Sequence, residues 1–339
     1  MRKGEFKKIL IIRLSSIGDI ILTTPLIRLL RKQFPDAQID YVTKSRFADL
    51  LRYNTRISNL FEFSEPGDFA ILRATRQLIY EQHYNAIIDL HKNFRSLILS
   101  VRQNTQFTGR LRKQALRRAA LVKLGWNRYS EIRPVMQRYI DVAAPLNIQD
   151  DGEGTELFIP KNIEAGFDDA HGSSFSKTAS AIALAPGAGY FTKKWPVENY
   201  QQLALAIVKS GKKCFVLGGP DDTGLGQKVA AVSPQIVDLT GKLSLLESAA
   251  ALKKMAHLVT NDTGLMHMAE AVKTPVTAIF GSTVRQLGFF PFLQESRVFE
   301  NLALSCRPCT HVGRHSCPKG HFLCMKSIGP DEIIKYVLS

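Results

Sequence analysis

The sequence is poor in cysteine and has no long apolar run. Five cysteines in 339 residues are too few for a disulfide scaffold. The apolar stretches around residues 9–12 and 20–30 are interrupted by Arg or Pro, so neither provides the roughly 20 apolar residues of a membrane-spanning helix. The basic residues 1–8 lead into a predicted strand and do not resemble a signal peptide. We therefore expect a cytoplasmic globular protein and exclude secreted, fibrous, disordered and membrane-spanning classes.

Acidic residues are also scarce relative to basic ones. Lys and Arg total 45 against 30 Asp and Glu, giving a net charge of +15. Residues 1–150 hold 26 basic and 13 acidic residues, and between Arg95 and Arg138 eleven Lys or Arg accompany a single acid, Glu131. Such a stretch favours an anionic partner, namely nucleic acid, an anionic membrane surface or an acidic substrate. The alternative is a solvated basic face.

Strand and helix patterns alternate in the first half of the chain and again in the second. Strands are predicted at 8–13, 38–43, 60–63 and 86–90, with helices at 20–33, 47–52 and 69–82 between them. The stretch after His91 predicts helices and no strand. A second series of the same kind runs from 181 to 280. The pattern predicts an α/β protein with two Rossmann-like domains, whose parallel sheets face a central cleft.

Residues 149–180 are rich in Gly, Ser and Asp and separate the two series. We therefore predict a first domain at 1–160, a linker at 161–180 and a second domain at 181–325. A C-terminal helix is predicted at 326–339 and is expected to pack back on the first domain.

The first motif is RLSSIGDIILTTPLIRLLRKQFP, residues 13–35. A strand ends there, Ser15, Ser16 and Gly18 form a tight turn, and Asp19 opens a helix. Small residues in such a turn let a ligand approach the backbone, and free amides at the helix start attract anions. Alternatively, Asp19 is an ordinary N-cap carboxylate.

The second motif is LAPGAGYFTKKWPVENY, residues 184–200. Two glycines follow a strand, but no third glycine completes a dinucleotide fingerprint. Thr192, Lys193 and Lys194 offer a hydroxyl and two ammonium groups, which could neutralise a diphosphate. A solvated basic loop with Trp195 buried is the competing interpretation.

The third motif is VTNDTGLMHMAEAVKTPVTAIFGST, residues 259–283. It places Asp262, Thr263 and Gly264 between a strand and a helix, so helix-start amides lie at the carboxyl edge of a sheet. His267 follows one turn into the helix. A lone histidine there is more often structural than catalytic.

The fourth motif is CRPCTHVGRHSCPKGHFLCM, residues 306–325. Four thiols with three nearby histidines could hold Zn²⁺, yet the spacing of the second cysteine pair does not match a zinc ribbon. A surface loop with free thiols is the alternative. The cysteines are Cys306, Cys309, Cys317 and Cys324.

Taken together and in this order, the segments resemble the heptosyltransferase family, glycosyltransferase family 9. The resemblance rests on SSIGDIILTTPLIRLLRKQFP, PGAGYFTKKWP, LTGKLSLLESAAALKK, NDTGLMHMA and CPKGHFLCM, and is strongest toward the heptosyltransferase II-like branch. It implies a GT-B fold with the acceptor on the first domain and the nucleotide-sugar donor on the second. The implied reaction moves L-glycero-D-manno-heptose, with inversion, from ADP-heptose to the phosphate- and carboxylate-bearing inner core of lipopolysaccharide.

The resemblance also implies roles for individual residues. Asp19 matches the family's proposed catalytic base. The donor-binding set is Thr192, Lys193, Gly241, Lys242, Asp262, Thr263, Gly264 and His267. The acceptor-binding set is Ser16, Gly18, Arg95, Arg110, Arg112, Lys113, Arg117 and Arg118. No metal site and no obligatory Mg²⁺ are expected, because GT-B enzymes usually work without one.

The sequence leaves two other functions open. A GT-B enzyme that uses a different nucleotide sugar, or a nucleotide-sugar epimerase, would share these motifs. A nucleic-acid-binding protein would account for the charge, but no basic platform interleaved with aromatic residues supports it. We expect a monomer that associates peripherally with the inner face of the inner membrane.

Overall fold

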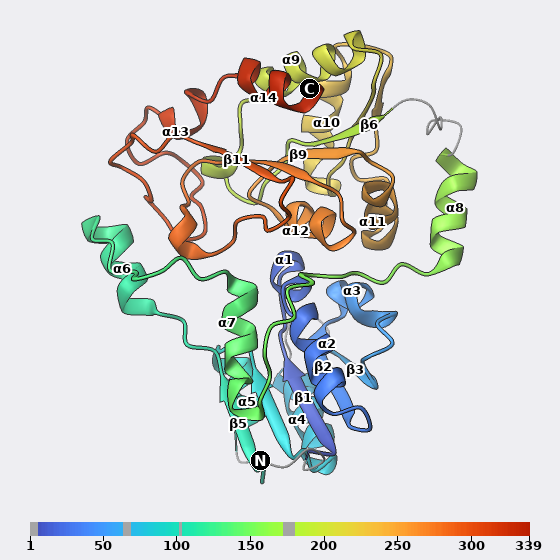
Figure 1. Ribbon diagram of the computed structural model, residues 1–339, viewed down its shortest axis with the longest axis vertical. Coiled ribbons are helices and arrows are strands. Elements are labelled where there is room, and N and C mark those ends of the chain that lie inside the picture. The colour runs from blue at the N-terminus through green and yellow to red at the C-terminus, as the bar shows by residue number, and fades with distance from the viewer. Residues whose placement is uncertain (1–5, 64–68, 102–103, 172–179) are drawn as a thin grey trace. The chain divides into compact units, whose positions relative to one another are not determined.

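The computed structural model describes residues 6–63, 69–101, 104–171 and 180–339. Contacts divide the chain into two units. Unit 1 comprises Met1–Lys113 and Val135–Phe158, and unit 2 comprises Gln114–Pro134 and Ile159–Ser339. Each unit contains one parallel sheet with helices on both faces (Figure 1). The predicted α/β class with two parallel sheets is confirmed.

The sheet of unit 1 has the order β3-β2-β1-β4-β5. Its strands are β1 (Lys8–Ile12), β2 (Gln38–Lys44), β3 (Asn59–Phe63), β4 (Ala86–Asp89) and β5 (Phe107–Arg110), and each pairs with its neighbours in parallel. The central strands β1 and β4 are almost wholly buried, which explains their continuous apolar sequences. The strand order reverses between β1 and β4, and the carboxyl edge at such a reversal is the usual place for a ligand in an open parallel sheet.

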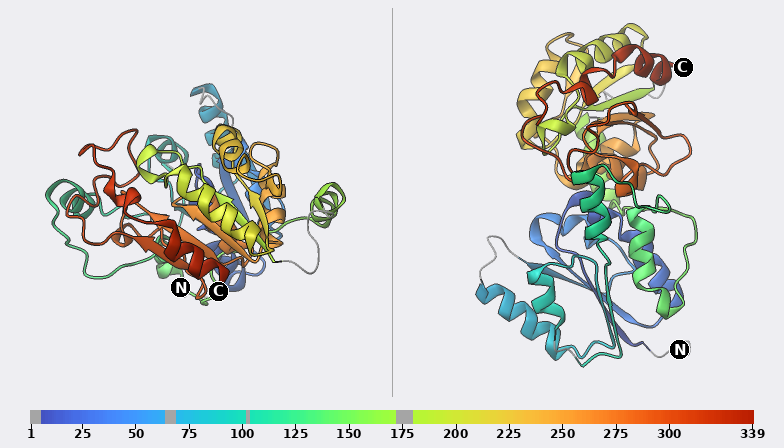
Figure 2. Two further views of the ribbon diagram at one scale, coloured as in Figure 1. Left: turned by 90° about the horizontal axis from the view of Figure 1, so that it is seen from above. Right: turned by 90° about the vertical axis from the view of Figure 1, so that its left-hand side faces the viewer.

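Six helices complete the described part of unit 1: α1 (Ile17–Ile21), α2 (Thr24–Gln33), α3 (Asp49–Arg52), α4 (Phe69–Glu81), α5 (Phe94–Ser100) and α7 (Val135–Val142). Helices α2 and α7 cover one face of the sheet, and α4 and α5 cover the other (Figure 2). The single helix predicted at 20–33 is two helices. The hydroxyls of Thr23 and Thr24 donate to the carbonyls of Ile20 and Ile21 at the break, at 2.7 and 2.8 Å.

The prediction of no strand after His91 is wrong, because β5 lies beside β4 at the edge of the sheet. Its sequence, FTGR, has a glycine and no apolar run, so it lacks a strand signal of its own. Gly109 is needed there, since a Cβ atom would lie 2.7 Å from the side chain of Val142.

The sheet of unit 2 has the order β11-β10-β9-β6-β7-β8, again all parallel. Its strands are β6 (Ala181–Ala185), β7 (Lys213–Val216), β8 (Ile236–Asp238), β9 (His257–Asn261), β10 (Val276–Phe280) and β11 (Arg297–Glu300). Strand β11 lies beyond the predicted series. The strand order reverses between β6 and β9, so the carboxyl ends of these two strands are the expected place for a ligand on this sheet.

The helices of unit 2 cover both faces of its sheet. They are α6 (Ala115–Leu124), α8 (Lys161–His171), α9 (Val197–Lys209), α10 (Thr223–Ala230), α11 (Leu245–Lys253), α12 (Gly264–Ala271), α13 (Leu323–Lys326) and α14 (Pro330–Leu338). Helices α9, α10 and α14 cover one face, and α11 and α12 the other (Figure 1).

Three segments differ from the predicted domain boundaries. Residues 114–134 group with unit 2, although the sequence places them in the first domain. Part of the predicted linker is helix α8, which ion-pairs with α11 through Glu164 and Lys253 at 2.6 Å. The rest of that linker, 172–179, lies outside the described residues. The C-terminal helix α14 packs on α9 of unit 2. No described helix is long and apolar enough to cross a membrane.

Candidate functional site

Asp19 lies at the carboxyl edge of the unit 1 sheet, on helix α1 directly after β1. Arg13 ends the same strand and donates to three groups: the Asp19 carboxylate at 2.7 Å, the Ser15 carbonyl at 2.7 Å and the Leu90 carbonyl at 2.6 Å. Arg13 therefore links the ends of β1 and β4 and fixes Asp19 at the switch point between them.

The two oxygens of the Asp19 carboxylate have different partners. Oδ1 accepts from Arg13 and from the hydroxyl of Tyr139 on α7 at 2.9 Å, whereas Oδ2 accepts from the hydroxyl of Ser16 at 3.0 Å. Burial alone would raise the pKa of Asp19, but the positive charge of Arg13 and the hydrogen bonds outweigh it and lower this pKa. Asp19 is thus ionised at neutral pH. Oδ2 also accepts from the amide of Ser16 at 3.4 Å, so each oxygen has two partners and Oδ2 has the longer hydrogen bonds.

His91 stands near Asp19 at the end of β4, and the sequence analysis assigns it no role. Its Nδ1 atom is buried without a hydrogen-bond partner among the described residues. Burial, together with the charges of Arg13, Lys113 and Lys44, lowers its pKa to about 3, so the ring is neutral at pH 7. Its position at a sheet edge, directly after a strand, is the signal that could have found it.

Positive charge gathers around this edge of unit 1. The charges of Lys113 and Lys44 both lower the pKa of His91. The pKa of Lys44 is itself lowered by burial and by the charges of Arg46 and Arg95. Lys44 and Arg46 are absent from the predicted acceptor set, because they lie at and just after the end of β2 and not in the basic stretch. Such a gathering of cations favours an anionic ligand.

The structure divides the predicted acceptor residues between the two units. Arg95 on α5, Arg110 at the end of β5, and Arg112 and Lys113 beyond it belong to unit 1, together with Ser16 and Gly18. Arg110 donates to the hydroxyl of Ser100 at 3.0 Å. Arg117 and Arg118 lie on α6 and group with unit 2.

In unit 2, Lys193 and Asp262 meet at the corresponding sheet edge. The Lys193 ammonium lies 2.6 Å from Oδ2 of Asp262, and the hydroxyl of Thr283 donates to the same oxygen at 2.9 Å. Both charged side chains are largely buried. A lysine held beside a helix start in this way can bind a diphosphate oxygen while its position is set by the carboxylate.

Asn261, which the sequence analysis overlooked, explains how Lys193 reaches Asp262. At the end of β9 it donates to the carbonyls of Pro186 and Gly187 at 2.9 and 3.1 Å and accepts from the amide of Trp195 at 3.0 Å. One side chain therefore fastens both ends of the 186–195 loop to the strand that carries Asp262.

The other predicted donor-binding residues near this edge differ in how far they are exposed to solvent. Thr263 is the N-cap of α12 and Gly264 its first residue, and both are partly exposed. Thr192 is 1% exposed and its hydroxyl accepts from the amide of Arg314 at 2.9 Å, so its side chain supports the loop. His267 is buried with its ring 6.3 Å from that of Phe289.

Gly241 and Lys242 lie on the exposed loop after β8. The amide of Gly241 donates to the carbonyl of Gly218 at 3.0 Å, which brings the loop against the turn after β7. Gly241 has φ +69°, and an added Cβ would approach Thr223 Oγ1 to 2.9 Å, so a glycine is required there. The ammonium of Lys242 donates to the carbonyl of Asp238 at 2.6 Å.

The cysteine-rich loop packs against the segment that carries Lys193. Arg314 contacts Thr192 through two hydrogen bonds of the backbone and hydroxyl. The Tyr190 ring lies tilted against His315, and Phe191 stacks on Phe322, at centroid distances of 5.2 and 4.5 Å. All five cysteines are free thiols, and Cys306 Sγ lies 3.8 Å from His321 Nε2. Over the described residues, no three His, Cys, Asp or Glu side chains are grouped to hold a metal.

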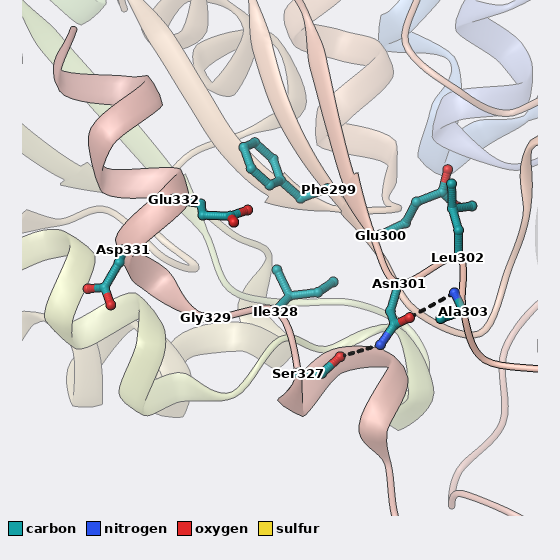
Figure 3. A pocket seen from close by; sticks show the side chains of 10 residues that line it. All are labelled: Phe299, Glu300, Asn301, Leu302, Ala303, Ser327, Ile328, Gly329, Asp331 and Glu332. Atoms are coloured by element: carbon teal, nitrogen blue, oxygen red, sulfur yellow. Dashed lines mark hydrogen bonds between the residues drawn. The ribbon is translucent and has the colours of Figure 1, made fainter.

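A pocket of about 470 Å³ lies between the end of β11 and the start of α14 (Figure 3). Asn301 crosses one side of it, donating to the hydroxyl of Ser327 at 2.7 Å and accepting from the amide of Ala303 at 3.0 Å. Glu300, Asp331 and Glu332 line it and disfavour an anionic ligand. None of the predicted site residues borders this pocket.

Comparison with known proteins identifies the family. A model for "Glycosyltransferase family 9 (heptosyltransferase)" matches residues 72–318. The chain belongs to glycosyltransferase family 9. It is therefore a glycosyltransferase, and its two parallel α/β units have the GT-B architecture predicted from the sequence.

Individual relatives have low sequence identity to this chain, but the similarity extends over most of both sequences. Lipopolysaccharide heptosyltransferase 2 of Salmonella typhimurium is 25% identical, over 81% of this chain and 82% of its own. A family 9 glycosyltransferase from Veillonella parvula superposes with a TM-score of 0.83 at 23% identity, covering 99% and 97% of the two chains. An E. coli heptosyltransferase solved with ADP-2-deoxy-2-fluoro heptose has a TM-score of 0.68 at 20% identity, covering 97% and 98%.

Proposed function

We propose that this family 9 enzyme moves L-glycero-D-manno-heptose from ADP-heptose, with inversion, to an anionic lipid A-Kdo or heptosyl acceptor of the lipopolysaccharide inner core. The observation that carries the proposal is the pair of sheet-edge sites, an ionised Asp19 among cations in unit 1 and the Lys193–Asp262 pair in unit 2. The relatives include a lipopolysaccharide heptosyltransferase and a heptosyltransferase solved with an ADP-heptose analogue, and both support this choice of donor and acceptor.

In this proposal Asp19 Oδ2 receives the proton of the acceptor hydroxyl. The hydroxyl oxygen forms the new bond to the anomeric carbon as the bond from that carbon to the diphosphate breaks, and ADP leaves with the electron pair. Because the pKa of Asp19 is lowered, the carboxylate is a weak base. Proton transfer is therefore late, and the negative charge of Asp19 also orients the hydroxyl and stabilises the oxocarbenium-like transition state.

The donor-binding sheet edge of unit 2 stabilises the leaving group. Lys193 neutralises charge that develops on the diphosphate, and the free amides at the start of α12 add hydrogen bonds. Asp262, with Thr283, holds the lysine in place before the donor arrives. The loop of Gly241 and Lys242 contacts the adenosine. None of these steps requires Mg²⁺. We also propose that the enzyme acts as a monomer at the inner face of the inner membrane.

The donor assignment is tested by calorimetric titration with ADP, UDP and GDP. We expect ADP to bind more tightly than UDP or GDP, and Lys193→Ala to weaken ADP binding at least tenfold through loss of a charge-assisted contact. Lys228→Ala, an exposed lysine on α10, is the matched control and should bind ADP as the unmodified chain does. A preference for UDP or GDP would replace the heptose donor and leave the fold unaffected.

The role of Asp19 is tested by heptose transfer measured beside ADP binding. Asp19→Asn should lower kcat by about 10²–10⁴, the usual contribution of a general base, while leaving ADP affinity within threefold. Asp36→Asn, at an exposed turn after α2, controls for loss of one carboxylate. Equal transfer rates for Asp19→Asn and Asp36→Asn would contradict the assignment.

A further inference from the structure

The segment from Arg112 to Arg133 is an excursion of the chain with little packing of its own. The chain leaves unit 1 after Lys113 and returns to it at Val135, and between these points it forms helix α6 and an extended stretch. Among the described helices and strands, none packs extensively on α6. Leu121 is the one buried residue of that helix. Packing therefore does not explain the apolar residues of this segment.

Four large apolar side chains of the 112–133 segment lie exposed to solvent. Leu116 is 88% exposed, and Leu124, Trp126 and Ile132 are each more than half exposed. Leu116 and Leu124 are about two turns apart on α6. Exposed apolar groups in this number on one short segment indicate a surface that becomes covered.

The charge of the same segment indicates what covers it. It holds seven Lys or Arg and a single acid, Glu131, which pairs with Arg133 at 3.3 Å. Two copies of such a segment would repel one another, which argues against self-association. Basic side chains interspersed with Leu and Trp are typical of elements that lie in the interface of an anionic bilayer. The guanidinium of Arg128 lies 5.4 Å from the Trp126 ring, an arrangement suited to the headgroup region.

We propose that the 112–133 segment docks the enzyme on an anionic membrane surface, with Leu116, Leu124 and Trp126 inserted at the level of the headgroups and the basic residues bound to lipid phosphates. The proposal rests on the proposed function, because a lipid-linked acceptor is reached at such a surface. It goes beyond that function by assigning membrane binding to side chains of this segment.

Trp126 supplies a direct readout. The chain has two tryptophans, and Trp195 is 2% exposed and packs edge-on against Tyr200, so it should not respond to lipid. Full-length protein is titrated with phosphatidylcholine vesicles that contain or lack 30% phosphatidylglycerol, with neither donor nor acceptor present. We expect a blue shift of the emission with anionic vesicles only, which Trp126→Phe abolishes.

Vesicle flotation with matched variants tests the two chemical components. Leu116→Ser/Leu124→Ser should lower the partition coefficient at least tenfold, and Lys123→Gln/Arg128→Gln about twentyfold, near fivefold for each basic residue. The controls are Leu302→Ser, equally exposed on another loop, and Lys161→Gln/Lys228→Gln. ADP binding is measured in parallel, so failure of the donor assignment is recognised separately.

Three results would overturn the proposal. One is equal binding of the segment variants and the controls to anionic vesicles. Another is a dimer in sedimentation that Leu116→Ser/Leu124→Ser dissociates, without vesicle binding by the unmodified chain. The third is tighter binding to RNA than to anionic vesicles at the same salt concentration.

Discussion

Three neighbours from different parts of unit 1 keep the Asp19 carboxyl group ionised. Arg13 directly follows β1, Ser16 shares the turn with Asp19, and Tyr139 comes from α7, 120 residues later. The motif around residues 13–35 predicts the carboxylate and its place at a helix start. It does not reveal Arg13 or Tyr139 as partners, because an ion pair across a turn and a contact with a distant helix arise from tertiary packing. For the same reason His91 was not predicted.

Removing the hydroxyl of Tyr139 should change the pH dependence of the reaction. Tyr139→Phe keeps the buried ring and removes one donor to Asp19, and a hydrogen bond to a charged group contributes about 1.5–3 kcal/mol. The pKa of Asp19 should rise, so the acid limb of kcat/KM should move to higher pH by about one unit. The measurement is a pH–rate profile of heptose transfer.

Tyr200→Phe is the control, since this buried tyrosine donates to the carbonyl of Ala185 and lies far along the chain from Asp19. Its acid limb should coincide with that of the unmodified enzyme. If Tyr139→Phe lowers the rate equally at every pH, the hydroxyl does not act through the ionisation of Asp19.

The central strands were predictable from their apolar patterns, whereas two of the four edge strands, β5 and β11, were not. Central strands such as β1, β4 and β6 are continuous apolar runs because both of their faces are buried. The edge strands β5 and β11 have one neighbour each and are partly exposed, so their sequences carry no such pattern. Likewise, helix α8 lies in a segment whose glycines and serines predicted a linker.

The cysteine-rich loop, residues 306–325, supports the 190–194 segment that carries Lys193. Gly313 has φ +129°, and a Cβ atom there would collide with the ring of Tyr190. Gly313→Ala should therefore displace the 190–194 segment, weaken ADP binding about tenfold and destabilise the fold by about 1–3 kcal/mol. Calorimetry with ADP and chemical unfolding measure the two effects.

Gly320→Ala separates the collision from backbone strain. Gly320 lies in the same loop with φ +72°, and nothing lies within 4 Å of its added Cβ. It should cost about 1 kcal/mol of stability and leave ADP affinity unchanged. Equal ADP affinities for the two variants would show that the loop does not position Lys193.

For the whole molecule, the positive charge is distributed between the two units differently from its distribution between the two halves of the sequence. Counted by halves, residues 1–150 carry +13. Counted by contact units, unit 1 has 21 basic and 15 acidic residues and unit 2 has 24 and 15, or +6 and +9. The difference arises because residues 114–134 group with unit 2, and because the acidic segment after α7 joins unit 1. There Asp151 pairs with Arg28 at 2.7 Å.

This division separates two uses of positive charge that the sequence combined. Arg95, Lys113 and Lys44 surround the Asp19 edge of unit 1, where an anionic acceptor is proposed to bind. The part of the 112–133 segment that follows Lys113 is assigned to the membrane. The first group should therefore act on any form of the acceptor, whereas the membrane-binding side chains should act only when the acceptor is embedded in lipid.

Kinetics with two forms of the acceptor measure this separation. With a deacylated, soluble acceptor, Arg95→Gln should raise KM about fivefold or more, whereas Lys123→Gln/Arg128→Gln should match the unmodified enzyme. With the acceptor in anionic vesicles, both variants should lose activity at low acceptor density, and added salt should weaken the unmodified enzyme in the same way because screening reduces both interactions. If Lys123→Gln/Arg128→Gln raised KM for the soluble acceptor as much as Arg95→Gln does, the 112–133 segment would bind the acceptor itself, and one basic surface would serve both purposes.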